Sequence, residues 1–114
     1  MNVKYKKYID YIVNDIQPPY IKYLNMYGLS NNEMDLVLSK VYNEPISIKG
    51  NCVYDANGNL IYFETSNGEW IKYDSNGKVI YHEDGNGFWY KREYDSNGKV
   101  IYHESFDGII IDNR

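Results

Sequence analysis

The sequence predicts an α+β protein in which two or three short N-terminal helices pack on a C-terminal antiparallel β-meander of about six to seven strands. Apolar residues follow a helical period up to about residue 45 and an alternating strand period after it. In addition, three repeats of about 20 residues begin at Tyr54, Tyr73 and Tyr94, with offsets of 19 and 21 residues. A unit this short cannot bury a core alone, so the copies are expected to stack into one sheet.

The chain of 114 residues is the length of one domain, with a helical part at 1–45 and a repeat sheet at 46–114. A protein of this size has a modest core. Its 14 tyrosines and 17% aromatic content compensate, because aromatic rings bury large apolar areas and stack well across strands.

Two helices are predicted before residue 28. The first has apolar residues spaced for one helical face, namely Ile9, Ile12, Val13 and Ile16. Pro18 and Pro19 end it, since proline removes a backbone donor and restricts the preceding residue. The second helix starts at these prolines and stops at Gly28.

A third helix is predicted after Ser30. Ser30 and Glu33 have the spacing of a capping box, in which each side chain bonds the other residue's backbone N–H. Its apolar stripe consists of Met34, Val37, Leu38 and Val41. Pro45 closes this segment.

Turn residues divide the rest of the chain into strands. Asn-Gly or Asp-Gly steps, the strongest short-range hairpin signal, occur at 57–58, 67–68, 76–77, 86–87, 97–98 and 107–108. The strands between them are expected at 52–55, 59–64, 69–74, 78–83, 88–95, 99–104 and 109–112. Connections this short make successive strands antiparallel neighbours.

The hairpin register decides which side chains share a face. A three-residue loop at 75–77 with its glycine in the left-handed region bonds Asp74 to Lys78. It then pairs Trp70 with His82. A two-residue turn would instead shift the register by one residue. The pairs that distinguish the two are Tyr73 opposite Val79 for the longer loop and Lys72 opposite Tyr81 for the shorter one.

We adopt the three-residue loop because it keeps each face consistent in all three repeats. One face then holds Leu60, Tyr62, Ile71, Tyr73, Val79, Tyr81, Tyr90, Tyr94, Val100 and Tyr102. The other holds Ile61, Phe63, Trp70, Lys72, Ile80, His82, Trp89, Lys91, Ile101 and His103. The first face is expected beneath the helices, and the second is expected to be at least partly exposed.

An exposed face with two tryptophans has the composition of an interaction surface. The residues expected to contact a partner are Trp70, Trp89, Glu69, Glu83, Asp84, Glu93, Lys72, Lys91, His82 and His103. The tryptophans would anchor a partner, and the acids would meet a basic surface on it. Two alternatives are that this face packs against a second copy of the chain or forms a second core layer.

Charge is divided unevenly along the chain. Residues 1–50 hold six lysines and five acids, whereas residues 51–114 hold six basic and eleven acidic residues. An acidic sheet disfavours direct nucleic-acid binding, which depends on clustered Lys and Arg. It suits a basic protein partner, such as a nucleic-acid-binding complex. The alternative role of the acidic residues is only to keep the aromatic sheet soluble.

The two histidines do not predict a metal site. His82 and His103 occupy the same place in successive repeats, where the first repeat has Phe63. A strand separates them, so their backbones are expected about 10 Å apart, too far to converge on one ion. The Asp-x-Asn-Gly turns lack the remaining ligands of a calcium loop. We expect no metal and no cofactor.

The single cysteine, Cys52, excludes an intramolecular disulfide and fits a reducing cytoplasm. No segment has the pattern of a signal peptide or the length of a membrane span, so a cytoplasmic protein with no membrane partner is expected. No phosphate loop, nucleophile elbow or His-Glu-x-x-His motif occurs, so no enzyme is expected.

The repeat unit Y-D-x-N-G-x-x-I-Y-x-E, present from Tyr54, Tyr73 and Tyr94, resembles the short YD-type repeats of small bacteriophage and prophage proteins. It is distantly similar to the longer YD repeats of large RHS shells. The resemblance covers about half of the chain and implies an intracellular accessory protein. Small acidic phage proteins of this kind are often antagonists of host defences such as CRISPR systems. The pattern carries no catalytic residues.

The function expected from the sequence is that of a non-enzymatic protein-binding inhibitor. It would antagonise a bacterial defence nuclease complex by occupying a basic surface, in the manner of an anti-CRISPR protein in the cytoplasm of an infected or lysogenic host. The alternative is a homo-oligomeric structural or carbohydrate-binding repeat module of a phage particle.

Overall fold

The computed structural model describes the backbone of residues 3–114 and the side chains of residues 9–114. Three helices come first: α1 (Val3–Asp15), α2 (Tyr20–Met26) and α3 (Asn31–Tyr42). The strands are β1 (Ser47–Lys49), β2 (Cys52–Tyr54), β3 (Leu60–Glu64), β4 (Trp70–Tyr73), β5 (Val79–Glu83), β6 (Trp89–Tyr94), β7 (Val100–Ser105) and β8 (Ile110–Asp112). They form one antiparallel sheet in chain order, so the predicted α+β meander is confirmed.

The sheet has eight strands, one more than the upper end of the predicted range. The additional strand is β1, which pairs with β2. Its connection places Gly50 at a φ of 60°, and the sequence there reads Gly-Asn. The turns were predicted from Asn-Gly and Asp-Gly steps, so this hairpin with the reverse order was not predicted.

The helices form as the sequence predicts. In α3, Ser30 and Glu33 make the reciprocal bonds of the capping box. The helix ends at Asn43, which adopts a φ of 58°. Both predicted apolar stripes face the core, which contains Ile9, Ile12, Ile16, Tyr20, Ile21, Leu24, Met34, Val37, Leu38, Ile46, Val53, Ile61, Tyr62 and Trp70.

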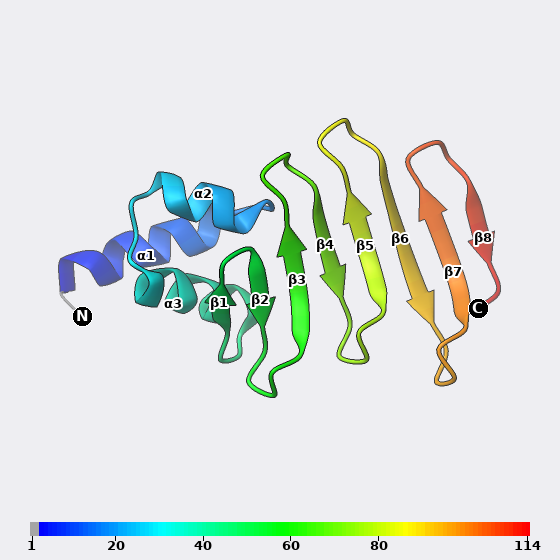
Figure 1. The fold of residues 1–114 in the computed structure, drawn as a ribbon, viewed down its shortest axis with the longest axis horizontal. Helices are drawn as coiled ribbons and strands as arrows, with labels where there is room; N and C mark the ends of the chain where they lie inside the picture. The colour runs from blue at the N-terminus through cyan, green and yellow to red at the C-terminus, as the bar shows by residue number, and fades with distance from the viewer. Residues whose placement is uncertain (1–2) are drawn as a thin grey trace.

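The core lies at one end of the molecule. Figure 1 shows the three helices gathered beside β1–β3, while β4–β8 continue away from them as a single layer. The expectation that the helices lie beneath one whole face of the sheet is therefore wrong. The Cα radius of gyration is 15.7 Å, whereas a compact chain of this length has about 13 Å. Within residues 3–114, no helix consequently covers either face of β5–β8.

The hairpin loops have the predicted three-residue form. At residues 75–77, Asp74 N–H donates to Lys78 O at 2.9 Å, and Tyr73 is opposite Val79. The Asp74 carboxylate accepts from the N–H groups of Asn76 and Lys78. Gly77 has a φ of 79°, in the left-handed region that this loop requires.

A β-bulge directly after the first loop of each repeat changes the register, whereas the second loops keep it regular. Between Lys72 and Tyr73 the pairing shifts by one residue, so Trp70 lies opposite Glu83 and not opposite His82. Lys72 then lies opposite Tyr81, which is the pair expected for the two-residue turn. The same shift occurs in the other repeats, and the unpaired residues are Ile61, Ile80 and Ile101.

The bulges overturn the predicted division of side chains between faces. Tyr62 is opposite Lys72, and Tyr81 is opposite Lys91. Tyr62, Tyr81 and Tyr102 therefore share a face with the tryptophans and lysines. The histidines lie on the other face. The physical reason is that one extra residue inverts the alternation for the rest of a strand.

Candidate protein-binding face

Each repeat places a tyrosine–glutamate pair on the same face of the sheet. The two residues are separated by one position, so their side chains point to the same side. In every copy the tyrosine hydroxyl donates to the glutamate Oε1. The bonds are Tyr62 to Glu64 at 2.8 Å, Tyr81 to Glu83 at 2.9 Å and Tyr102 to Glu104 at 2.5 Å.

In the first repeat this pair binds the start of α2. Glu64 is only 3% exposed, and its carboxylate accepts from Ile21 N–H at 2.7 Å and Lys22 N–H at 3.0 Å. Tyr20 N–H donates to the Tyr62 hydroxyl at 3.0 Å. These N–H groups lie in the first turn of a helix, where no intrahelical acceptor exists and the helix dipole favours a negative charge.

Four rings stack across neighbouring strands and form what we call the aromatic row, Tyr62, Trp70, Tyr81 and Trp89. The centroids of Trp70 and Tyr81 are 4.7 Å apart, and those of Tyr81 and Trp89 are 6.1 Å apart with only 4° between the planes. Tyr20 of α2 continues the row beyond Tyr62 at 5.0 Å. The inner rings therefore direct their faces toward one another and their edges outward.

Two lysines, Lys72 and Lys91, lie on the same face of the sheet as the aromatic row. The Nζ of Lys72 lies 5.6 Å from the centroids of both Tyr20 and Trp70, in the range of cation–π attraction. Burial lowers the pKa of Lys72. Its counterpart in the second repeat, Lys91, is exposed and lies 3.5 Å from Glu104.

In the second and third repeats, no helix of the described chain covers the residues equivalent to Tyr62, Glu64, Trp70 and Lys72. We call this surface the tyrosine–glutamate face; it comprises Tyr81, Glu83, Trp89, Lys91, Tyr102 and Glu104 of β5–β7. Tyr81, Glu83 and Trp89 are half-buried, compared with the buried Tyr62 and Glu64 of the first repeat.

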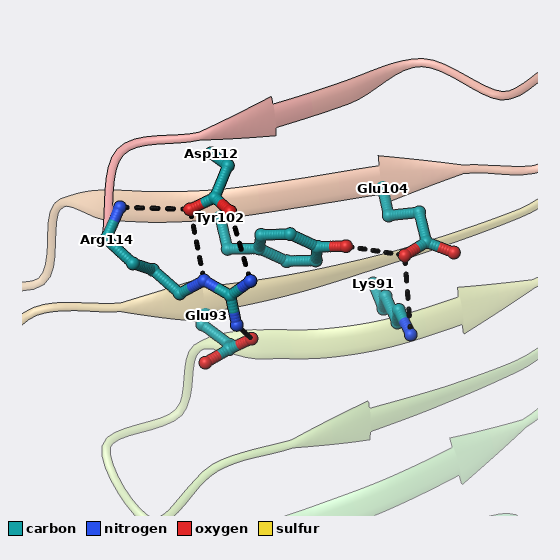
Figure 2. A network of polar contacts seen from close by, with 6 residues as sticks. All are labelled: Lys91, Glu93, Tyr102, Glu104, Asp112 and Arg114. Carbon is teal, nitrogen blue, oxygen red and sulfur yellow. Dashed lines mark hydrogen bonds and ion pairs between the residues drawn. The ribbon is translucent and has the colours of Figure 1, made fainter.

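Charged side chains border this face at its β8 end. Figure 2 shows Arg114 reaching across to Glu93, with 3.2 Å between Nη1 and Oε2, and also bonding Asp112. The guanidinium carbon lies 4.2 Å from the centre of the Tyr102 ring. The hydrogen bond from Tyr102 lowers the pKa of Glu104, so this carboxylate stays ionised. Burial and the bond to Glu83 raise the pKa of Tyr81 to about 12, which keeps its hydroxyl a donor.

The opposite face carries the histidines. Tyr90 lies between them, with its centroid 5.3 Å from that of His82 and 5.7 Å from that of His103. They occupy β5 and β7 with β6 between, as predicted. Arg92 Nε donates to His103 Nδ1 at 3.1 Å, and its guanidinium lies over the Tyr90 ring.

The ten residues predicted to contact a partner divide into three groups. Six lie on the side of the aromatic row, namely Trp70, Lys72, Glu83, Trp89, Lys91 and Glu93. His82 and His103 lie on the opposite face. Glu69 and Asp84 lie in turns, where Glu69 is 3.2 Å from His82 Nε2 and Asp84 accepts from the N–H groups of its own loop.

The predicted exposure of Trp70 is wrong. Its side chain is 8% exposed and belongs to the core, where the rings of Tyr62 and Tyr81 stack against it. Trp89 has the equivalent place one repeat later, beyond the reach of the helices, and keeps part of its surface in solvent.

The tyrosine–glutamate pairs were not predicted as contacts. The signal was present, since Tyr-x-Glu recurs in all three copies. It was missed because the unbulged register assigned the tyrosines to the face beneath the helices.

Among the residues that the structure describes, no three His, Cys, Asp or Glu side chains gather as a metal site would require. None of the helices described here is long and apolar enough to cross a membrane. No family model, curated protein or solved structure matches the chain.

Proposed function

We propose that this protein is a non-enzymatic, protein-binding inhibitor that acts by occupancy through its tyrosine–glutamate face. The observation that carries the proposal is the contact with α2 in the first repeat. There a polypeptide segment, the start of α2, contacts Tyr62, Glu64 and Lys72, and Trp70 stacks beside them on Tyr62. The second repeat presents the same four residue types at Tyr81, Glu83, Trp89 and Lys91 with no such segment on them.

The chemistry of the face favours a protein partner over a glycan. Sugars stack on the faces of aromatic rings, but Trp70 and Tyr81 have neighbouring rings against both of theirs. The ring edges and carboxylate oxygens that remain accessible suit N–H groups and basic side chains.

A basic partner is further supported by charge, since the chain has a formal net charge of −4. Together with the resemblance of its repeats to those of small phage proteins, this favours a defence nuclease complex as the partner. The proposal places the protein in the cytoplasm of a bacterial host, and the single cysteine fits that location.

The test is capture of partners from a lysate that contains defence nucleases, using the tagged protein and two matched variants. Trp89→Ala removes a half-buried ring from the tyrosine–glutamate face, whereas Tyr90→Ala removes a half-buried ring from the opposite face of the same strand. An interface anchor contributes about 2 kcal/mol or more, so Trp89→Ala should weaken binding of the captured complex at least about thirtyfold. Tyr90→Ala should leave it within about threefold.

Circular dichroism of both variants checks the fold. Recovery of a nuclease complex that depends on Trp89 but not on Tyr90 would support the proposal. Recovery of the tagged protein alone, or equal loss in both variants, would contradict it. Trp70→Ala is unsuitable here because this side chain belongs to the core.

A homo-oligomeric structural module is the second candidate function. The exposed Ile110 and Ile111 of the edge strand β8 favour it, because an unpaired apolar edge suits association between copies of the chain.

A further inference from the structure

The outer edge of β8 is apolar and unpaired. Ile109, Ile110 and Ile111 are 51%, 59% and 51% exposed, and β8 is the last strand of the sheet. Natural edge strands are usually protected by short length, charged side chains, proline, a bulge or a covering element. Strand β8 is short and carries Asp112, but residues 108–112 include neither lysine nor proline, and β7 pairs with β8 in a regular register.

The other edge of the sheet is closed. There α3 packs against β1, and the outward N–H of Ile48 donates to Asp35 Oδ1 at 2.9 Å. The N–H of Ile46 donates to Ser39 Oγ, also at 2.9 Å. With a single open edge, two copies joined by that edge form a closed pair and not a fibre.

The backbone hydrogen bonds show which groups of β8 face outward. Ser105 N–H donates to Ile109 O at 3.0 Å, and Asn113 N–H donates to Ile101 O at 2.7 Å. In and beside β8, the backbone N–H and C=O groups of the odd-numbered residues therefore point toward β7. Because the ladder alternates, the N–H and C=O groups of Ile110 and Asp112 point toward the open edge.

We propose that two copies of this chain pair through their β8 edges, antiparallel and centred on Ile110, to give one continuous sheet. A two-fold axis perpendicular to a sheet requires one residue to lie opposite its own symmetry mate. With Ile110 in that place, the two Ile110 backbones exchange both outward hydrogen bonds. Ile109 then lies opposite Ile111 of the second copy.

Charge favours this register over one centred on Asp112. Centring on Ile110 places Asp112 opposite Gly108 of the second copy, so no acid faces an acid. Centring on Asp112 would oppose two carboxylates, which destabilises a cross-strand pair. A contact between two short strands buries less area than a standard protein–protein interface. We therefore expect a reversible dimer with a dissociation constant on the order of 100 μM.

Analytical ultracentrifugation over a range of concentrations tests the dimer. Ile110→Lys should weaken association at least about tenfold, since two ammonium groups would meet at the axis. Met26→Lys, which makes the same charge change at a 73% exposed site on α2, should have no effect. A protein that stays monomeric up to about 0.5 mM, or a dimer insensitive to Ile110→Lys, would overturn the proposal.

Disulfide trapping tests the register itself in a Cys52→Ser background. Hydrogen-bonded antiparallel partners have Cα atoms about 5.5 Å apart, within the range of a disulfide. Ile110→Cys should therefore form a covalent dimer on oxidation, and Ile109→Cys should not, because its mate is Ile111. The reverse outcome would refute pairing centred on Ile110.

Discussion

At the residue scale, Glu64 shows how one side chain of a repeat acquires a separate role. The equivalent glutamates, Glu83 and Glu104, accept a hydrogen bond from the tyrosine two positions earlier and remain partly in solvent. Glu64 makes the same bond and also accepts two backbone N–H groups of α2 in a buried setting. It therefore connects the helices to the sheet.

We expect Glu64→Gln to lower the free energy of unfolding by about 2 kcal/mol, because hydrogen bonds to a charged acceptor contribute more than neutral ones and the site is buried. Glu83→Gln, the same change one repeat later, should cost less than about 1 kcal/mol. Urea denaturation of both variants measures the difference. Equal effects would show that the contact with α2 does not stabilise the fold.

At the element scale, the β3–β4 and β5–β6 turns approach each other closely. An added Cβ at Gly85 would lie 2.6 Å from the carbonyl oxygen of Asn67 in the β3–β4 turn. Gly85 is the first residue of its three-residue loop, and the same position in other loops is held by Ala56, Ser66 and Ser75. The loop itself therefore does not need glycine there, and the close approach of the two turns is what requires it. Its φ lies outside the left-handed region, so the backbone conformation itself would accept a side chain.

Gly85→Ala should destabilise the protein by about 1–3 kcal/mol, the usual cost of overpacking against an atom that cannot move freely. Ser75→Ala, at the same place in a loop whose residue already has a Cβ, should change stability by less than about 0.5 kcal/mol. Thermal and urea unfolding would measure both. A Gly85→Ala variant as stable as the parent would show that the two turns separate at little cost.

At the scale of the whole molecule, aromatic hydroxyls are concentrated in and beside the core. Burial raises the pKa of Tyr20, Tyr42 and Tyr62, and that of Tyr81 reaches about 12. The ordinary tyrosine pKa is 10.0, so the unfolded chain loses these protons first. The stability that these tyrosines contribute is therefore complete below pH 10 and falls as the pH rises toward 12.

We accordingly expect the free energy of unfolding to decrease steeply between about pH 10 and about pH 12, with a cooperative rise in tyrosinate absorbance as the protein unfolds. The lowered pKa of Lys72 acts in the opposite direction, but it is a single group. Urea titrations at a series of pH values test this. A free energy of unfolding that stays constant through this range would contradict the assignment of these hydroxyls to the core.

Much of the fold could be predicted from the sequence because its determinants are local. The capping box at Ser30, the prolines and the three-residue glycine loops depend on residues within a few positions of one another. Together they led to the correct order of helices and the antiparallel meander. The tryptophans and lysines were correctly assigned to one face.

The register and the state of the candidate site were decided by the tertiary structure. The bulges at Ile61, Ile80 and Ile101 leave no local signal, since these residues look like ordinary strand isoleucines, yet each inverts the alternation that follows. The burial of Glu64 depends on α2, more than 40 positions away in the chain, and that of Trp70 depends on the rings of Tyr62 and Tyr81 on the neighbouring strands. Local residue patterns determined which elements form, and long-range contacts determined which copy of the repeat is covered and which remains open.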